Sequence, residues 1–346
     1  MEAGRVMRVA VVGAGGVGGY FGGRLANAGI DTTFIVRGAT LGALRTRGLR
    51  VESINGDFTL RRADVPVRPV VGGRGRPPSL QATDDPAQAG GVDAILMTVK
   101  SWQIPEAAAR LAPMIGADTV VVPLENGIDA PEVLAGIVGR QHVLGGLCGI
   151  VSFLVEPGHI RHIASEPFVM FGELDNRPSE RTQRLCDAFV RAGVKADIPP
   201  DIHRSMWSKF LFIAPLSAIG ALTRLPVGVW RSIPETRAIA ERALAETVAL
   251  AQARGIDLGD DAVARTIERY EGLDPAATSS LQRDVMEGKP SELDAQIGAV
   301  VRLARESNVD VPVCELLYHC LLPQERQARN SPLSPLSGER VARSAG

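Results

Sequence analysis

The run Arg8-Val-Ala-Val-Val-Gly13-Ala-Gly15-Gly-Val-Gly18 near the start of the chain joins an apolar strand to a G-x-G-x-x-G turn and then to a small-residue helix. Gly13 permits a tight turn, Gly15 lets backbone N–H groups approach a pyrophosphate, and Gly18 lets the helix pack against the strand. The helix N-terminus then presents its partial positive charge to the phosphates. The pattern predicts a dinucleotide-binding turn, and the alternative is a glycine-rich loop without function. The expected cofactor contacts are Gly13, Ala14, Gly15, Gly16, Val17 and Gly18.

The segment Asp31-Thr-Thr-Phe-Ile-Val-Arg37 is typical of the next strand of the same unit. Folds that bind NAD place an acidic residue after this strand, where it accepts a hydrogen bond from the ribose 2′-hydroxyl. Arg37 stands there instead, with Arg45 and Arg47 on the helix that follows, and a cation suits the 2′-phosphate of NADP. The sequence therefore predicts NADP(H) as cofactor, the alternative being that Arg37 is a solvated loop residue.

The composition favours a soluble globular protein with two cores. The chain has 346 residues, of which 45% are hydrophobic, and a formal net charge of −1. Because charges of both signs are interspersed, there is no basic field for nucleic acid or an anionic membrane. The most apolar window, Phe210–Leu222, is shorter than the roughly 20 residues that span a bilayer and contains Pro215. No transmembrane helix is expected.

The four cysteines show neither C-x-x-C nor Cys/His ligand spacing, which argues against a metal site. Cysteine usage this sparse fits a reducing compartment, so the protein is expected in the cytoplasm. We predict that all four are core thiols: Cys148, Cys186, Cys314 and Cys320.

The predicted fold class is α/β, with an N-terminal Rossmann-type dinucleotide-binding domain over residues 1–199 and an all-α C-terminal domain over 200–323. Val67–Pro78 is expected to be a surface excursion, and 324–346 a disordered tail because the segment is polar and repetitive. The predicted strands are Arg8–Val12, Thr33–Val36, Ala94–Val99, Thr119–Val122 and Val143–Cys148, with antiparallel pieces at Gly158–Ile163 and Pro167–Phe171. The predicted helices are Asp201–Leu222, Pro234–Arg254, Asp260–Glu271, Ser279–Glu287 and Ser291–Ser307.

Lys209 stands alone among large apolar residues in the segment Met206-Trp-Ser-Lys209-Phe-Leu-Phe-Ile213. Apolar neighbours would partly desolvate its ammonium and lower its pKa, which makes Lys209 a candidate general acid near neutral pH. The alternative is a lysine that extends from an amphipathic helix to water.

Three further clusters carry polar side chains at informative places. Ser280 and Asp284 share one face of a predicted helix, and Glu292 falls in the first turn of the next, where Ser291 is a candidate cap. A capping cluster with solvated carboxylates is the alternative. Lys100 and Asn126 each follow a predicted strand, and thus lie at the carboxyl edge where such sheets bind ligands. The Asn126-Gly pair is also compatible with a plain turn.

Together these motifs resemble the ketopantoate reductase (2-dehydropantoate 2-reductase) family in order and spacing, over residues 7–323. The resemblance implies that Lys209 donates a proton to the substrate carbonyl oxygen while NADPH delivers hydride to the carbon, in a cleft between two domains. It implies that Lys100, Asn126 and Glu292 contact the cofactor and that Ser280 contacts the substrate carboxyl end. Ser217 and Asp284, which share helix faces with Lys209 and Ser280, are taken as further substrate contacts.

The chain departs from this family at three asparagine positions, which hold Ile213, Ser217 and Val227. Each lost hydrogen bond weakens recognition of ketopantoate by about 1–3 kcal/mol, which puts the substrate in doubt. We predict NADPH-dependent reduction of a 2-oxo acid, with ketopantoate as the first candidate substrate and pantothenate biosynthesis as the pathway. The protein is expected to be a homodimer. The alternatives are a reductase of a more apolar 2-oxo acid or ester, and a non-catalytic NADP-binding regulator.

Overall fold

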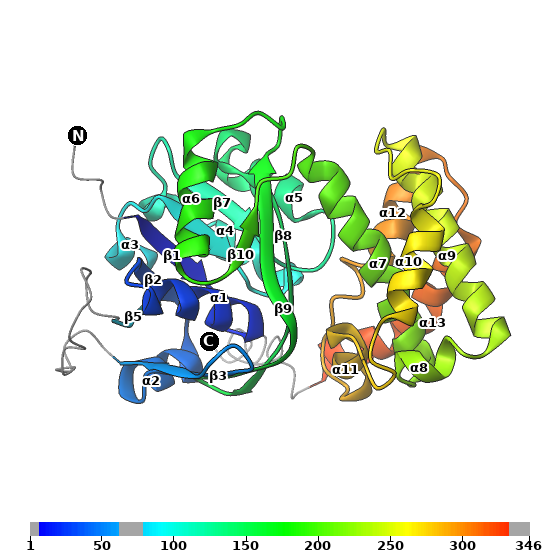
Figure 1. Ribbon diagram of the computed structural model, residues 1–346, viewed down its shortest axis with the longest axis horizontal. Coiled ribbons are helices and arrows are strands. Elements are labelled where there is room, and N and C mark those ends of the chain that lie inside the picture. Colours follow the sequence, from blue (N-terminus) through cyan, green and yellow to red (C-terminus); the bar gives the residue numbers. More distant parts are fainter. Residues whose placement is uncertain (1–6, 62–78, 332–346) are drawn as a thin grey trace, which may run out of the picture. The chain divides into compact units, whose positions relative to one another are not determined.

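The computed structural model describes residues 7–61 and 79–331, which form two compact units (Figure 1). The first unit takes in the described residues up to Glu125 together with Ala130–Ser205. The second takes in Asn126–Asp129 and the described residues from Met206 onward. The division thus falls inside a helix rather than at residue 199. The expected excursion at 67–78 lies outside the described residues.

A parallel five-stranded sheet forms the centre of the first unit, and four of its strands are predicted from the sequence, whereas the strand at Gln81–Thr83 is not. The strand order is β5-β2-β1-β6-β7, so the order reverses beside β1. In such sheets ligands bind at the carboxyl ends of the strands where the order reverses. The strands are β1 (Arg8–Val12), β2 (Asp31–Ile35), β5 (Gln81–Thr83), β6 (Ala94–Met97) and β7 (Val120–Pro123).

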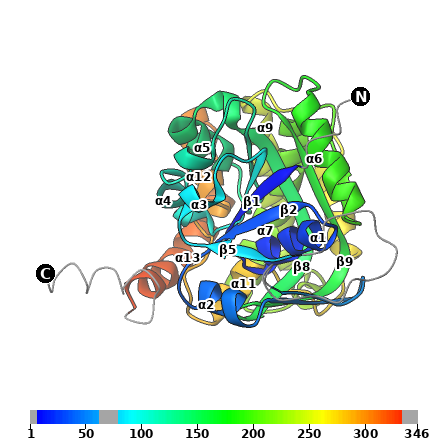
Figure 2. The same ribbon diagram turned by 90° about the vertical axis from the view of Figure 1, so that its left-hand side faces the viewer.

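Helix α1 (Gly16–Asn27) follows β1 and packs on the sheet with little space to spare (Figure 2). A Cβ on Gly22 would lie 2.7 Å from the Val11 side chain and 2.8 Å from that of Phe34. Glycine at this place therefore lets the helix backbone approach β1 and β2. The other helical segments up to residue 142 are α2 (Gly38–Thr46), α3 (Pro86–Ala89), α4 (Ile104–Ala108) and α5 (Ala130–Val138), with short 3₁₀ turns at Ser101–Gln103, Ala112–Met114 and Arg140–His142.

The first unit contains a second sheet besides the parallel one. The two antiparallel pieces predicted at 158–163 and 167–171 are one long strand, which pairs antiparallel with β8 and parallel with β3. The strand predicted at 143–148 is longer than expected and extends to Glu156. The sheet contains β3 (Leu49–Ser53), β4 (Phe58–Leu60), β8 (Leu144–Glu156), β9 (His159–Glu173) and β10 (Lys195–Asp197).

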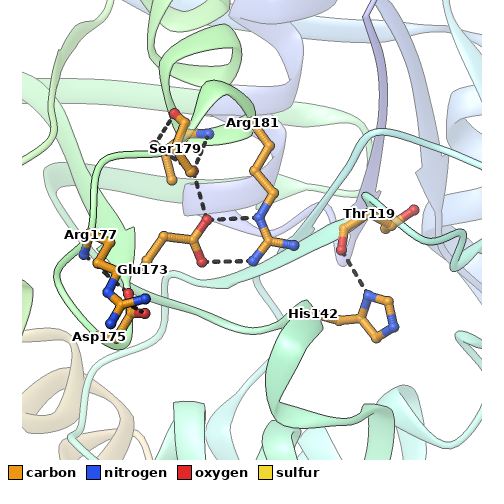
Figure 3. Close-up of polar contacts among 8 residues, drawn as sticks. Thr119, His142, Glu173, Asp175, Arg177, Ser179 and Arg181 are labelled. Carbon is orange, nitrogen blue, oxygen red and sulfur yellow. Dashed lines mark hydrogen bonds and ion pairs between the residues drawn. The ribbon is translucent and has the colours of Figure 1, made fainter.

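The carboxylate of Glu173 joins the end of β9 to the start of α6 (Glu180–Arg191), as Figure 3 shows. Arg181 donates to it from Nε and Nη2, each at 2.7 Å, and the Ser179 hydroxyl donates at 2.7 Å. Ser179 also caps α6, because its Oγ accepts a hydrogen bond from the Thr182 N–H at 3.2 Å. These contacts fix the direction in which the chain leaves the sheet.

The second unit is helical, as predicted. Its helices are α7 (Ile202–Thr223, which begins in the first unit), α8 (Val227–Trp230), α9 (Pro234–Ala253), α10 (Ala262–Glu271), α11 (Ser280–Met286), α12 (Ile297–Ser307) and α13 (Pro312–Asn330). By length and composition α7 resembles a membrane span, with a mean hydropathy of 1.3. However, 67% of that window is buried inside the protein, as in the core helix of a globular domain.

Helix α13 corrects two expectations. It continues to Asn330, so residues 324–330 are helical and do not belong to a disordered tail. The reason is that Glu325 and Ala328 extend the buried stripe of Leu317 and Leu321 at helical spacing. Cys320 lies on the opposite, exposed face, whereas the other three cysteines are buried as predicted. The remainder of the expected tail, 332–346, lies outside the described residues.

Candidate active site

The turn after β1 has the tight geometry that the sequence predicts. Gly13 has a φ of +97°, a conformation that favours glycine, and its N–H donates to the Ile35 carbonyl at 3.1 Å. The Thr98 hydroxyl donates to the Gly13 carbonyl at 2.8 Å. A Cβ on Gly18 would lie 2.1 Å from that carbonyl oxygen, so only glycine allows α1 to start this close to β1.

The N-terminus of α1 is open to an anion. Its N-cap residue is Gly15, which has no side chain to donate or accept a capping hydrogen bond, and its first turn holds no acidic residue. A Cβ built on Gly15 meets no described atom within 4 Å, whereas one on Gly16 would lie 2.8 Å from the Ser152 carbonyl oxygen. Backbone N–H groups beside open space at a helix N-terminus fit the pyrophosphate of a dinucleotide.

Arg37 lies at the carboxyl edge of the parallel sheet, where it precedes the first turn of α2. Its guanidinium contacts the carboxylate of Glu106, with Nη1 2.5 Å from Oε1 and Nη2 3.4 Å from Oε2. The other two predicted arginines have different partners. Arg45 lies 3.9 Å from the Asp84 carboxylate and Arg47 donates to the Pro157 carbonyl. Of these three, Arg37 is the one that directly follows β2 and precedes α2.

Two more of the predicted residues follow strands of this sheet. Lys100 follows β6, and its Nζ lies 5.9 Å from the centre of the Trp102 ring. Asn126 follows β7 and groups with the second unit. There Gly127, with a φ of +128°, comes so close to Ala295 that a Cβ would lie 2.7 Å from its carbonyl oxygen. The Asn126 loop therefore packs on the segment that carries Glu292.

That segment differs from the sequence prediction. Helix α12 begins at Ile297, so Glu292 lies in a turn before the helix and Ser291 is not its cap. Instead Ser291 is held by Glu325 of α13. Its backbone N–H donates to the carboxylate at 3.0 Å and its hydroxyl at 2.6 Å. Glu292 itself is buried, with 6% of its surface exposed. Glu325 is not among the predicted site residues, because the polar composition beyond residue 323 is typical of a tail.

Helix α7 carries Lys209, which is half-buried, and two of its neighbours in sequence are Trp207 and Phe210. These two rings are buried and meet edge to face, with centroids 5.6 Å apart. Pro215 lies inside the helix, where it removes one backbone donor. Tyr270 donates from its hydroxyl to the Phe212 carbonyl at 2.7 Å, and burial raises the pKa of that hydroxyl. The helix thus continues past the proline.

The three departures from the family pattern have different settings. Ile213 and Ser217 lie four and eight residues beyond Lys209 in α7, and so share its helix face. Ser217 is fully buried, and its hydroxyl has no hydrogen-bond partner among the residues described. Val227 begins α8 and belongs to the hydrophobic core of the unit. A buried hydroxyl without a partner is unusual in a folded protein.

Ser280 and Asp284 lie one turn apart on α11. The cap of this helix is Ser279, whose hydroxyl oxygen accepts from the Gln282 N–H at 3.0 Å. The capping role that sequence analysis left open for the cluster therefore falls to Ser279 and not to Ser280.

Two family models match the chain. One, described as ketopantoate reductase PanE/ApbA, matches residues 9–176, and the other, described as ketopantoate reductase PanE/ApbA C terminal, matches residues 201–325. The chain belongs to the ketopantoate reductase family. It is accordingly an oxidoreductase that resembles 2-dehydropantoate 2-reductase, and the family resemblance seen in the sequence is confirmed.

Relatives of this reductase match it over nearly their whole length. An uncharacterized oxidoreductase, YkpB of Bacillus subtilis, is 29% identical over 90% of this chain and 97% of its own. The 2-dehydropantoate 2-reductase of Archaeoglobus fulgidus is 30% identical over 91% and 97%. The solved ketopantoate reductase of Ralstonia eutropha superposes with a TM-score of 0.80 at 28% identity, covering 94% of this chain and 100% of that one.

A more distant solved structure shares the fold alone. It is D-mandelate dehydrogenase with NADH and anilino(oxo)acetate, at 18% identity and a TM-score of 0.81, covering 94% of this chain and 100% of that one. The fold therefore carries a nicotinamide cofactor in that protein.

Proposed function

We propose that this reductase converts a 2-oxo acid to a 2-hydroxy acid with NADPH. The observation that carries the proposal is the open glycine turn at the N-terminus of α1, at the point where the strand order reverses. Gly13, Ala14, Gly15, Gly16, Val17 and Gly18 would hold the pyrophosphate, and Arg37 the 2′-phosphate. Lys100, Asn126 and Glu292 supply further cofactor contacts. NADPH, when bound, supplies the hydride that reduces the carbonyl carbon.

Lys209 is the proton donor in this proposal. Reduction of a ketone builds negative charge on the carbonyl oxygen, and an ammonium beside it both stabilises that charge and donates the proton. Lys209 lies on α7 and is half-buried. Ser280 and Asp284 of α11 and Ser217 of α7 contact the substrate, with Ser280 at its carboxyl end.

A panel of 2-oxo acids tests the activity itself. NADPH oxidation is followed at steady state with ketopantoate and about a dozen related compounds. Turnover of any member supports the reductase, whereas NADPH binding without turnover on the whole panel supports the non-catalytic regulator. The homodimer and the cytoplasmic location remain predictions of the sequence.

The cofactor assignment makes a prediction for Arg37→Ala. Loss of a charge-assisted hydrogen bond of about 1.5–3 kcal/mol to the 2′-phosphate should raise the KM for NADPH by roughly 10- to 100-fold. The KM for NADH should change little, because NADH has no phosphate there. Arg177→Ala, at an arginine that is 84% exposed, is the control and should change neither value. Equal effects of Arg37→Ala on both cofactors would contradict the assignment.

The α7 residues make a prediction for the substrate. Ile213 in place of an asparagine offers nothing to the hydroxyl of ketopantoate but suits an alkyl or aryl group. A 2-oxo acid with an apolar side chain is therefore expected to show a higher kcat/KM than ketopantoate, by roughly 10-fold for each hydrogen bond that ketopantoate fails to make. The measurement is the two kcat/KM values side by side. A clear preference for ketopantoate would show that other residues replace the missing amides.

A further inference from the structure

The ion pair between Arg37 and Glu106 joins two loops at the carboxyl edge of the parallel sheet. Arg37 follows β2, and Glu106 lies in the first turn of α4, which follows β6. Strand β1 lies between β2 and β6. The pair therefore crosses the carboxyl end of β1, from which the turn at Gly13 leads to α1.

This arrangement puts an acid and a base at the place where ribose identity is read. A carboxylate there accepts a hydrogen bond from the 2′-hydroxyl of NADH, whereas an arginine binds the 2′-phosphate of NADPH. The phosphate carries a charge of about −1.5 to −2 near neutral pH, so a carboxylate beside it is repulsive. The hydrogen bond from Arg37 lowers the pKa of Glu106, which keeps its carboxylate charged at neutral pH.

The pair is not a structural anchor. The side chains of Arg37 and Glu106 are 53% and 52% exposed, and an ion pair this open to water contributes little to stability. Arg37 can therefore leave Glu106 for a phosphate without loss of the fold, and removal of the Glu106 charge leaves the fold intact. A surface pair of similar exposure, Arg140 with Glu132, provides a matched comparison in the same unit.

We propose that Glu106 sets the preference of this enzyme between NADPH and NADH. Its carboxylate competes with the 2′-phosphate for Arg37, and it accepts a hydrogen bond from the ribose 2′-hydroxyl when the phosphate is absent. The consequence is an enzyme that binds NADH as well as NADPH. The ratio of its affinities for NADPH and NADH is smaller than Arg37 alone would give. The inference rests on the proposed function in one respect, that Arg37 contacts the 2′-phosphate.

The test uses adenosine 2′,5′-bisphosphate and adenosine 5′-monophosphate as probes, because they carry the two ribose forms and need no substrate or turnover. Their dissociation constants are measured by calorimetry on the full chain and on Glu106→Gln, Glu132→Gln and Arg37→Ala. Glu106→Gln should bind the bisphosphate about 3- to 10-fold more tightly and the monophosphate up to about 3-fold more weakly. Glu132→Gln should leave both constants unchanged.

Other outcomes separate this inference from the assignment beneath it. If Glu106→Gln leaves the ratio of the two constants within twofold, or tightens both probes equally, the inference is overturned. If that happens while Arg37→Ala still loses affinity for the bisphosphate alone, the NADPH assignment stands without it. If Arg37→Ala weakens both probes equally, the NADPH assignment and the inference fail together.

Discussion

Replacing Lys209 by alanine is expected to lower kcat by roughly 10²- to 10⁴-fold while NADPH binding stays nearly unchanged. The ammonium acts when charge develops on the carbonyl oxygen, so its loss raises the barrier of the chemical step and not the dissociation constant of the cofactor. The measurements are kcat from NADPH oxidation and the dissociation constant from fluorescence titration.

Two further variants sharpen this test. Lys209→Arg keeps the positive charge but holds its proton too tightly to donate it, so kcat should remain low. Lys195→Ala removes an exposed lysine of β10 and should leave kcat at the level of the unmodified enzyme. A Lys209→Ala enzyme with near-native kcat would falsify the role of proton donor.

Replacing Glu325 by alanine is expected to lower the free energy of unfolding by about 2–4 kcal/mol. The Glu325 side chain is only 1% exposed, and its carboxylate accepts from the N–H and the hydroxyl of Ser291 and pairs with Arg329 at 2.7 Å. Alanine would leave both Ser291 donors without this acceptor and would remove the nearer carboxylate of the Arg329 ion pairs. Urea unfolding measures the change, with Glu315→Ala on the outer part of α13 as control.

Glutamine at position 325 should behave differently. Burial raises the pKa of Glu325, so the folded protein favours its protonated form more than the unfolded chain does. The pH-dependent part of the free energy of unfolding that comes from Glu325 is therefore fully present below the pKa of the unfolded chain. It is lost as the pH rises through the pKa of the folded protein. Glu325→Gln keeps an oxygen for Ser291 without a buried charge, and should cost less than about 1 kcal/mol at pH 7. A loss as large as that of alanine would contradict this account.

The elements that could be predicted from the sequence are those whose signal is local. The turn from Gly13 to Gly18 needs only the neighbouring strand and helix, and α7 shows its apolar pattern within one segment. The pairing of β3 with β9 could not be predicted in this way, because Glu52 and Arg161 pair across 109 residues and nothing in β3 specifies its partner. Pairing at that distance depends on tertiary packing rather than on propensity.

The residues of the candidate site also differ in whether their signal is local. Arg37 and Lys209 are recognisable from their place after a strand or among apolar residues. Glu106 and Glu325 resemble ordinary charged residues of a helix surface, and only their partners in the fold reveal what they contact. Serine is common at helix caps, but α12 begins only at Ile297, and the Ser291 hydroxyl oxygen accepts from the Leu293 N–H at 3.3 Å in the turn before it.

The pairing of β3 with β9 also delays the completion of the second sheet during synthesis. A ribosome adds roughly 5–20 residues each second, so β3 waits on the order of 5–20 s for the partner that lies 109 residues further on. During that interval the backbone edge of β3 that later pairs with β9 lacks this partner. Messages that stall or end before codon 159 release chains with this strand edge still exposed, which makes them substrates for chaperones and for aggregation.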